Sequence, residues 1–386
     1  MNPLTRHAPD FIRQIAPYTA GKPISEVVRE LGLDPARVVK LASNENPLGI
    51  GFKALQAIES QLAGLGRYPD SNGFSLKQAL AAKHSVAAGQ ITLGNGSNDI
   101  LELAAKVMLT AGSNAVFSQY AFAVYALAAQ GCGAQAHVVP ALNHGHDLPR
   151  FLQAIDTHTR VVFIANPNNP TGTFLQADTL LAFLKHVPSD VLVVLDEAYN
   201  EYLPPALQYD STQWVERFPN LLVSRSFSKA HGLAGLRVGY AVSSLPVADL
   251  LNRVRQPFNV NALALAAAQA SLADHAHLQK TCALNAAGLV QLAHGISKIN
   301  LNYVPSVGNF VLFNVLPQPL TNPASHDVQV ADAGQKVFAA LQALGVIVRP
   351  VGAYGLPEWL RVSVGLPEEN TAFLQALPKA LELALN

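Results

Sequence analysis

Two short apolar runs, Arg160–Ala165 and Val191–Leu195, constrain most strongly what this chain can fold into. Both are rich in β-branched residues, and such runs are typical of strands buried on both faces of a parallel sheet. Leu221–Arg225 and Val238–Val242 have the same character, and helix-like segments alternate with strand-like ones through the middle of the chain. Because parallel strands need crossover connections, this alternation predicts an α/β fold around a mostly parallel sheet.

The pattern changes near Pro257, after which a long helical region is followed by short strands and helices. This predicts a smaller α+β domain, and its closing helix over Thr371–Leu385 is expected to be kinked or split at Pro378. The expected parts are an N-terminal arm over residues 1–45, shared between the small domain and dimer contacts, a large domain over 46–273 and a small domain over 274–386.

Composition and charge exclude several classes of protein. Half of the 386 residues are hydrophobic and only 13% are charged, which indicates a compact globular chain rather than a disordered one. The 26 Lys and Arg residues balance the 26 Asp and Glu residues, so no charge excess favours nucleic acid or an acidic membrane as a partner. No apolar run reaches the roughly 20 residues that span a bilayer, and residues 1–15 lack the apolar core of a signal peptide.

The cysteines and histidines predict neither a disulfide framework nor a metal site. Cys132 and Cys282 lie far apart and form no Cys-x-x-Cys motif, so we interpret them as buried thiols. His275 and His277 lie two residues apart on a predicted helix and therefore face different directions. These features fit a reducing cytoplasm.

The segment Ser226–Gly239 carries the most specific chemistry in the sequence. It combines the hydroxyls of Ser226 and Ser228, the amine of Lys229 and the guanidinium of Arg237 with several glycines. The hydroxyls and the guanidinium can converge on a phosphate, which arginine binds in bidentate fashion. Most lysines are solvated, but one at the edge of a phosphate site is well placed to form a Schiff base with a phosphorylated aldehyde.

A second candidate group follows the run Val191–Leu195, where Asp196 comes next and Tyr199 three residues later. Open α/β sheets bind ligands at the carboxyl ends of their strands. A buried carboxylate needs a cationic partner, and a protonated pyridine nitrogen would supply one. The alternative is an aspartate that caps the next turn.

Two further segments also follow predicted strands. The Asn-Pro and Thr-Gly pairs of Asn166–Gly172 predict a turn, within which Asn169 is a candidate donor to a ligand oxygen. Gly94–Asn98 leads into the start of a helix, whose free N–H groups favour an anion. It is not a dinucleotide-binding fingerprint, because Asp99 stands where the third glycine should be.

Along nearly its whole length the chain resembles the fold-type-I pyridoxal-phosphate aminotransferases, and within them the histidinol-phosphate aminotransferases. This resemblance implies a three-layer α/β/α large domain with a mostly parallel sheet, a smaller α+β domain, pyridoxal 5′-phosphate as cofactor and a homodimer with shared active sites. The segments that carry it are Leu41–Pro47, Arg67–Asp70, Gly94–Asn98, Asn168–Gly172, Asp196–Tyr199, Ser226–Gly239, Val346–Arg349 and Leu360–Val362.

The resemblance implies a role for each matching residue around the cofactor ring. Lys229 would hold the cofactor covalently and would move protons during the reaction. Asp196 would pair with the pyridine nitrogen, and Tyr199 and Asn169 would hydrogen-bond the phenolic oxygen of the ring.

The resemblance also implies how the ring face and the phosphate are held. Tyr120 would stack on the ring, with Phe122 as the alternative, because Ser118-Gln119 stand where the relatives usually carry Pro-Thr. The residues implied to hold the cofactor phosphate are Gly96, Ser97, Asn98, Ser226, Ser228 and Arg237, together with Tyr68 from the neighbouring subunit.

The implied reaction is ping-pong transfer of an amino group between L-histidinol phosphate and 2-oxoglutarate or glutamate, in histidine biosynthesis. Arg361 would receive the anionic group of the substrate, with Arg349 and Tyr18 nearby, although a structural ion pair is the alternative for Arg349. The alternative activities are an aromatic-amino-acid aminotransferase and a phospho-amino-acid decarboxylase on the same fold. A ligand-sensing domain of a transcription regulator is disfavoured, because the short arm has no room for a helix-turn-helix.

Overall fold

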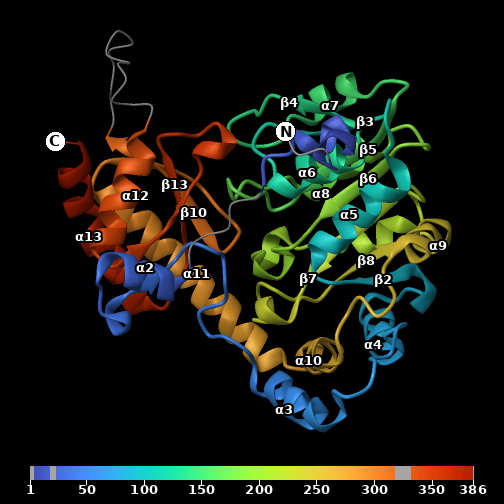
Figure 1. The fold of residues 1–386 in the computed structure, drawn as a ribbon, viewed down its shortest axis with the longest axis horizontal. Helices are drawn as coiled ribbons and strands as arrows, with labels where there is room; N and C mark the ends of the chain where they lie inside the picture. The colour runs from blue at the N-terminus through green and yellow to red at the C-terminus, as the bar shows by residue number, and fades with distance from the viewer. Residues whose placement is uncertain (1–3, 18–22, 318–331, 386) are drawn as a thin grey trace.

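The computed structural model describes residues 4–17, 23–317 and 332–385, and its two lobes are visible in Figure 1. The larger lobe is built on a seven-stranded sheet, in which β8 runs antiparallel to its neighbours β2 and β7 and the remaining pairs are parallel. The predicted mostly parallel sheet is therefore confirmed. Its strands, in spatial order, are β2 (Ile91–Gly94), β8 (Gly239–Ser243), β7 (Leu221–Ser226), β6 (Leu192–Asp196), β5 (Thr159–Ala165), β3 (Asn114–Ser118) and β4 (Gln135–Val139).

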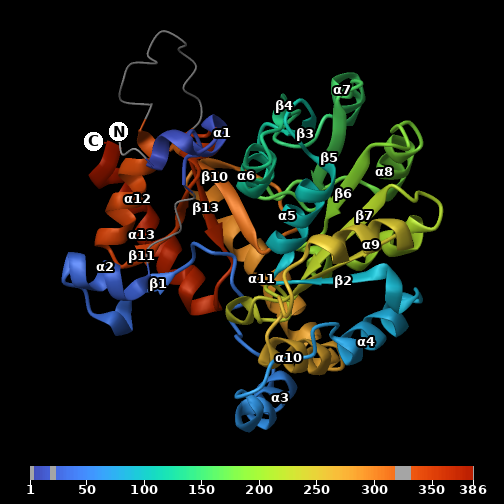
Figure 2. The same ribbon diagram turned by 45° about the vertical axis from the view of Figure 1, so that its right-hand side comes forward.

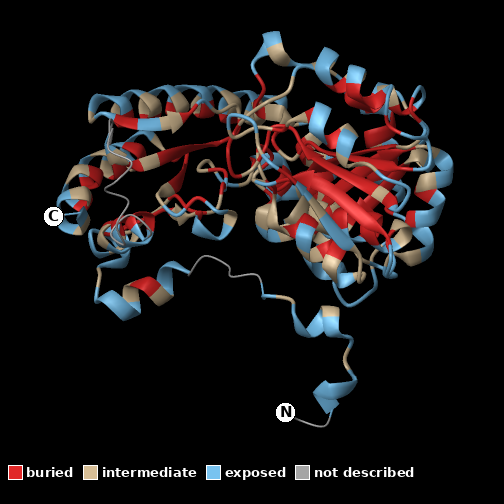
Figure 3. Cartoon of the chain, turned by 90° about the horizontal axis from the view of Figure 1, so that it is seen from above, coloured by how far each residue is buried: buried red, intermediate tan, exposed pale blue. Residues whose placement is uncertain are grey.

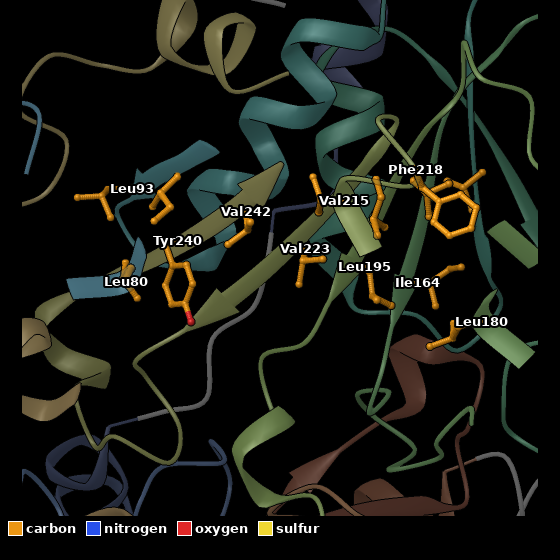
Figure 4. Packing of buried hydrophobic residues seen from close by; sticks show 14 of the residues in the cluster. Leu80, Leu93, Ile164, Leu180, Leu195, Val215, Phe218, Val223, Tyr240 and Val242 are labelled. Carbon is orange, nitrogen blue, oxygen red and sulfur yellow. The ribbon is translucent and has the colours of Figure 1, made fainter. Parts of the chain in front are cut away.

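The central strands are buried on both faces, as their apolar runs predict. Successive side chains of a strand point to opposite faces, so neighbours such as Val194 and Leu195 belong to two different apolar clusters. Figure 4 shows the cluster on one face, where Ile164, Leu195 and Val223 lie in a row. Each fully buried aliphatic side chain of this kind stabilises the fold by about 1.5–3 kcal/mol.

Helices cover both faces of the large sheet and make a three-layer arrangement. One face packs against α5 (Ser97–Met108), α6 (Ala123–Gly131) and α9 (Leu245–Val254). The helices that contribute to the cluster on the other face are α3 (Phe52–Gln61), α4 (Phe74–His84), α7 (Leu148–Ala154), α8 (Ala177–Leu184) and α10 (Ala262–Leu272). In Figure 3 the buried residues follow the strands, while the outer surfaces of the helices are exposed.

The smaller lobe contains a four-stranded antiparallel sheet. In spatial order its strands are β12 (Arg349–Pro350), β13 (Trp359–Ser363), β10 (Phe310–Pro317) and β9 (Leu301–Val304). The helices whose apolar side chains join its core are α11 (His275–Lys298), α12 (Ala333–Ala343) and α13 (Pro367–Leu385). Figures 1 and 2 agree that α11 runs from beside α10 into this lobe.

The structure corrects several local expectations. The N-terminal segment has α2 (Ile24–Leu31) and a strand that the sequence pattern did not predict, β1 (Val39–Lys40), which pairs in parallel with β11 (Val346–Ile347). β11 and β12 follow one another closely in the chain but lie in different sheets. Helix α13 continues through Pro378 without being split. Among the described residues no helix is both long and apolar enough to cross a bilayer.

Candidate active site

A cavity of about 330 Å³ lies at the carboxyl ends of the central strands. Ala165, Asp196 and Ser226 are the last residues of β5, β6 and β7, and all three line it. Arg349 and Arg361 of the small sheet line its other wall. The predicted site residues that line this cavity are Ser97, Asn98, Asn169, Asp196, Tyr199, Ser226, Ser228, Lys229, Arg237, Arg349 and Arg361.

Asp196 is a buried carboxylate that is only partly satisfied by the protein. Its Oδ2 accepts a hydrogen bond of 2.9 Å from the Tyr125 hydroxyl, whereas Oδ1 has no hydrogen-bond partner among the described residues. Burial raises the pKa of Asp196 to about 6, against the lowering effects of the Tyr125 bond and the Ala198 backbone N–H. A nearby cation would favour the charged carboxylate, so this site is suited to a ligand that brings one.

Lys229 lies in the turn that follows β7, on the same side of the large sheet as Asp196. Its Nζ is 5.5 Å from the centre of the Tyr199 ring. The Tyr199 hydroxyl accepts a hydrogen bond of 2.9 Å from Asn44 Nδ2, which leaves the phenolic hydrogen available for donation to a ligand. The Lys229 amine and the Tyr199 hydroxyl therefore belong to residues that line the same cavity.

The start of α5 and Arg237 form an anion cradle. Arg237 donates from Nη1 to Ser228 Oγ at 3.4 Å and to the Ala234 carbonyl at 3.2 Å. A Cβ at Gly96 would come within 2.3 Å of Arg237 Nη2, and Gly96 has a φ of +81°, so only glycine fits there. The free N–H groups of the first turn of α5, which begins at Ser97, add to this positive site.

Two arginines of the small sheet face the cavity together. Arg349 and Arg361 are directly opposite each other in the register of β12 and β13, so their side chains share one face of the sheet. Arg361 donates to Asn169 Oδ1 and to the Ala42 carbonyl at 3.0 Å, which connects it to the loop after β5. Like charges directly opposite destabilise a sheet, and an anion between the two guanidinium groups would reverse that effect.

The charge balance of the cavity favours an anionic ligand. Four lining side chains are basic and two are acidic, namely Lys229, Arg237, Arg349 and Arg361 against Glu45 and Asp196. Glu45 is neutralised by Lys40, whose Nζ lies 3.0 Å from its carboxylate. Positive charge is therefore in excess around the enclosed volume.

The remaining predicted site residues lie outside the cavity lining or outside the described ranges. Tyr120 stacks against His144, with ring centroids 5.8 Å apart, and Phe122 rather than Tyr120 lines the cavity. Tyr68 is 83% exposed and stacks on Phe258. Tyr18 lies outside the described residues.

Sequence reasoning missed the functions of two residues that the structure brings to the site. Asn44 belongs to a motif that carries the family resemblance, but its bond to Tyr199 spans 155 positions of the chain. Tyr125 is 71 positions from Asp196, and its sequence neighbours indicate only a buried apolar position on a helix. The spacing of residues along the chain predicts neither of these two contacts.

Pyridoxal phosphate, the cofactor that the resemblance implies, matches these groups. Asp196 Oδ1 offers an acceptor to a protonated pyridine nitrogen, and Lys229 offers an amine to an aldehyde. Arg237 and the start of α5 offer a cradle to the phosphate. The residues present therefore fit this cofactor.

Comparison with known proteins agrees with this geometry. The family described as aminotransferase class I and II matches residues 36–377. Histidinol-phosphate aminotransferase 2 of Ralstonia nicotianae is 58% identical over 376 residues, 97% of this chain and 97% of that protein. A protein of the same name from Pseudomonas aeruginosa is 57% identical over 96% of each chain.

The same relationship holds among solved structures. The crystal structure of histidinol-phosphate aminotransferase from Sinorhizobium meliloti, in complex with pyridoxal 5′-phosphate, superimposes with a TM-score of 0.87 at 26% identity. The match covers 97% of this chain and 98% of that one. This chain belongs to the class I and II aminotransferases and, within them, to the histidinol-phosphate aminotransferases.

Proposed function

We propose that this protein transfers an amino group between L-histidinol phosphate and 2-oxoglutarate, with pyridoxal phosphate attached to Lys229, as a step in histidine biosynthesis. The observation that carries the proposal is the pair Arg349 and Arg361, directly opposite in register and lining the same cavity as Lys229 and Asp196. Two guanidinium groups side by side suit a dianionic phosphate. The names of the relatives at 57–58% identity support the same substrate.

The chemistry divides between the cofactor and the protein. Pyridoxal phosphate, when bound, supplies an electron-withdrawing ring that stabilises negative charge at the α-carbon of the amino substrate. The Lys229 amine, once free of the cofactor, would take the α-carbon proton of the substrate as general base and deliver it as general acid to the aldehyde-derived carbon of the cofactor. Asp196 keeps the ring nitrogen protonated, and Tyr199 donates to the phenolic oxygen.

Arg361 serves both substrates in our proposal, because each presents an anion to the same wall of the cavity. 2-Oxoglutarate and glutamate present a carboxylate, whereas histidinol phosphate presents a dianionic phosphate in the same place. Arg349 provides the second positive charge that the dianion favours. Phe122, which lines the cavity, becomes the preferred candidate to stack on the ring, in place of Tyr120.

We further propose a homodimer in the cytoplasm. Exposed apolar side chains occur on α3 and at the start of α4, and Tyr68 between these helices is 83% exposed beside them. A second subunit would cover these side chains and would bring its own Tyr68 to the cofactor phosphate. Both cysteines, Cys132 and Cys282, are unpaired thiols, which suits a reducing compartment.

A comparison of amino donors tests the substrate. With 2-oxoglutarate as acceptor, kcat/KM should be highest for histidinol phosphate, and histidinol should lose a factor of about 100 or more, because two arginines then lack their anion. Phenylalanine and tyrosine should be poorer still. If histidinol matched histidinol phosphate, or phenylalanine exceeded both, the proposed substrate would be wrong while the cofactor assignment would stand.

A substitution of Lys229 tests the cofactor assignment independently. Lys229→Ala should abolish turnover and the visible absorption band of the lysine-bound cofactor, because no other lysine lines the cavity among the described residues. Retention of near-normal activity would exclude Lys229 as the residue that carries the cofactor.

A further inference from the structure

The carboxylate of Asp196 has two oxygens in different environments. Oδ2 accepts the 2.9 Å hydrogen bond from Tyr125, and Oδ1 is buried without a partner among the described residues. Asp196 itself is 5% exposed and lines the cavity. One oxygen is therefore used by the protein, and the other is available to a ligand.

Tyr125 packs against three aromatic neighbours. Its ring stacks on Phe163 with centroids 4.8 Å apart and an interplanar angle of 6°. Phe122 meets its edge at 6.0 Å and 87°, and Phe117 lies at 6.4 Å. The side chain is completely buried on α6, and these contacts place its hydroxyl beside Asp196.

The direction of the Tyr125–Asp196 hydrogen bond follows from burial. Desolvation raises the pKa of Tyr125 well above its usual 10, so the phenol stays protonated and acts as the donor. The same bond favours the charged form of Asp196, whose pKa burial otherwise raises. Tyr125 thus opposes the tendency of this buried carboxyl to take up a proton of its own.

We propose that Tyr125 is a positioning residue for the cofactor ring: its hydroxyl holds Oδ2 of Asp196, so that Oδ1 is presented to the pyridine N–H. The inference rests on the proposed function, because it assumes that Asp196 pairs with that nitrogen. Tyr125 acts only through Asp196 and touches neither the substrate nor the reacting atoms.

The competing explanation is that Tyr125 only fills the core between the large sheet and α6. The two explanations predict different ligand selectivity. Loss of packing would weaken all ligands of the cavity equally, whereas loss of positioning would weaken only ligands that carry a ring N–H. The ratio of two affinities therefore separates them, independently of catalytic activity.

The test uses apoprotein of the full chain and two probes. One is pyridoxamine 5′-phosphate, and the other is its carbocyclic analogue, in which C–H replaces the ring nitrogen. Wild type should bind the pyridine more tightly than the analogue. In Tyr125→Phe this preference should fall about tenfold, because a hydrogen bond to a charged group is lost.

Tyr240→Phe is the matched control. Tyr240 is also buried, and its hydroxyl hydrogen-bonds His84 Nε2 at 2.8 Å, but it does not line the cavity. This variant loses a comparable buried hydrogen bond and should keep the wild-type preference. Phe163→Leu is a second variant that leaves the Tyr125 hydroxyl in place but loosens the ring, and it should lower the preference by a smaller factor.

A double-mutant cycle tests whether Tyr125 works through Asp196. In an Asp196→Asn background the preference for the pyridine should already be small, and adding Tyr125→Phe should change it no further. A tenfold additional loss in that background would overturn the proposal.

The wild-type measurement separates this proposal from the proposed function. If wild type binds both probes equally, Asp196 does not pair with the ring nitrogen, and the assigned role of Asp196 and the present inference fail together. If wild type prefers the pyridine and Tyr125→Phe keeps the whole preference, Tyr125 only packs, and the proposed function stands.

Discussion

At the scale of single residues, Arg349 and Arg361 are chemically alike but differ in burial. Arg361 is 7% exposed and donates to Asn169 and to the Ala42 carbonyl, so its guanidinium is oriented before any ligand arrives. Arg349 is only partly buried at the matching position of β12. The difference suggests that Arg361 binds every anion, whereas Arg349 adds to the binding of a dianion.

Substitutions should separate these two roles. Arg361→Gln should lower kcat/KM for both histidinol phosphate and glutamate, by about 10- to 100-fold, because each loses a charged hydrogen bond of roughly 1.5–3 kcal/mol. Arg349→Gln should lower kcat/KM for histidinol phosphate by a similar factor and for glutamate by much less. The two half-reactions can be followed separately by cofactor absorbance. Equal losses for both substrates in Arg349→Gln would contradict the assigned division.

At the scale of elements, the turn between β2 and α5 determines whether a phosphate can be held. Gly96→Ala would place a Cβ 2.3 Å from Arg237 Nη2 at a φ of +81°, so both the backbone and the guanidinium must shift. The affinity for pyridoxal phosphate should fall at least about tenfold, while the affinity for pyridoxal, which lacks the phosphate, should change little. Equilibrium binding to the apoprotein measures both affinities.

Gly131→Ala at the end of α6 is the control for this substitution. A Cβ there meets nothing within 4 Å, and Gly131 does not line the cavity. Both affinities should remain at wild-type values in this variant. If Gly96→Ala weakened pyridoxal as much as pyridoxal phosphate, the turn would support the fold of the site rather than the phosphate.

Some strands and helices could be predicted from the sequence and others could not, and the difference has a physical cause. The central strands are recognisable because burial on both faces requires continuous apolar runs. β4 (Gln135–Val139) is a mostly exposed edge strand without such a run, and β1 has two residues, so neither carries a readable pattern. Pro378 lies inside α13 because tertiary packing of the flanking Leu377 and Ala380 overrides its poor helix propensity.

The residues of the candidate site likewise divide into those that the sequence could place and those that it could not. Residues that end predicted strands, such as Asp196, or follow them, such as Lys229, could be placed at one edge of the sheet, because parallel strands end together. Contacts between distant segments, such as Tyr125 with Asp196, depend on packing that no local spacing encodes. The choice between Tyr120 and Phe122 falls in an irregular loop, where neither helical nor strand periodicity applies.

At the scale of the whole molecule, buried histidines give stability a defined pH dependence. Burial lowers the pKa of His84, His146 and His231 from the usual 6.5 to about 4, so they are neutral in the folded protein. Between pH 6.5 and 4 the unfolded chain binds protons that the native state does not, and stability falls as the pH falls. Burial also lowers the pKa of His144. The raised pKa values of Glu102, Asp196 and Glu197 act in the opposite sense but involve fewer groups than the four histidines.

His146→Gln should reduce this pH dependence. Each such histidine contributes at most about 1.4 kcal/mol of stability per pH unit within the window. The fall in the urea midpoint between pH 7 and pH 5 should therefore be smaller in His146→Gln than in wild type. The exposed His186 provides the control, since His186→Gln should leave the fall unchanged. An unchanged fall in His146→Gln would show that burial of this ring does not control the pH response.

The assembly of two chains can be tested through Tyr68, which is 83% exposed and absent from the cavity of its own chain. If Tyr68 binds the cofactor phosphate of a partner subunit, Tyr68→Phe should weaken cofactor affinity about tenfold, because a hydrogen bond to a charged group is lost. The ring would still stack on Phe258, so the surface itself is preserved.

Mixing Tyr68→Phe with Lys229→Ala makes hybrid dimers, in which one site has an intact Lys229 from one chain and an intact Tyr68 from the other. At limiting cofactor the mixture should be more active than either variant alone, whereas a Tyr68 that acts within its own chain, or not at all, would give no gain.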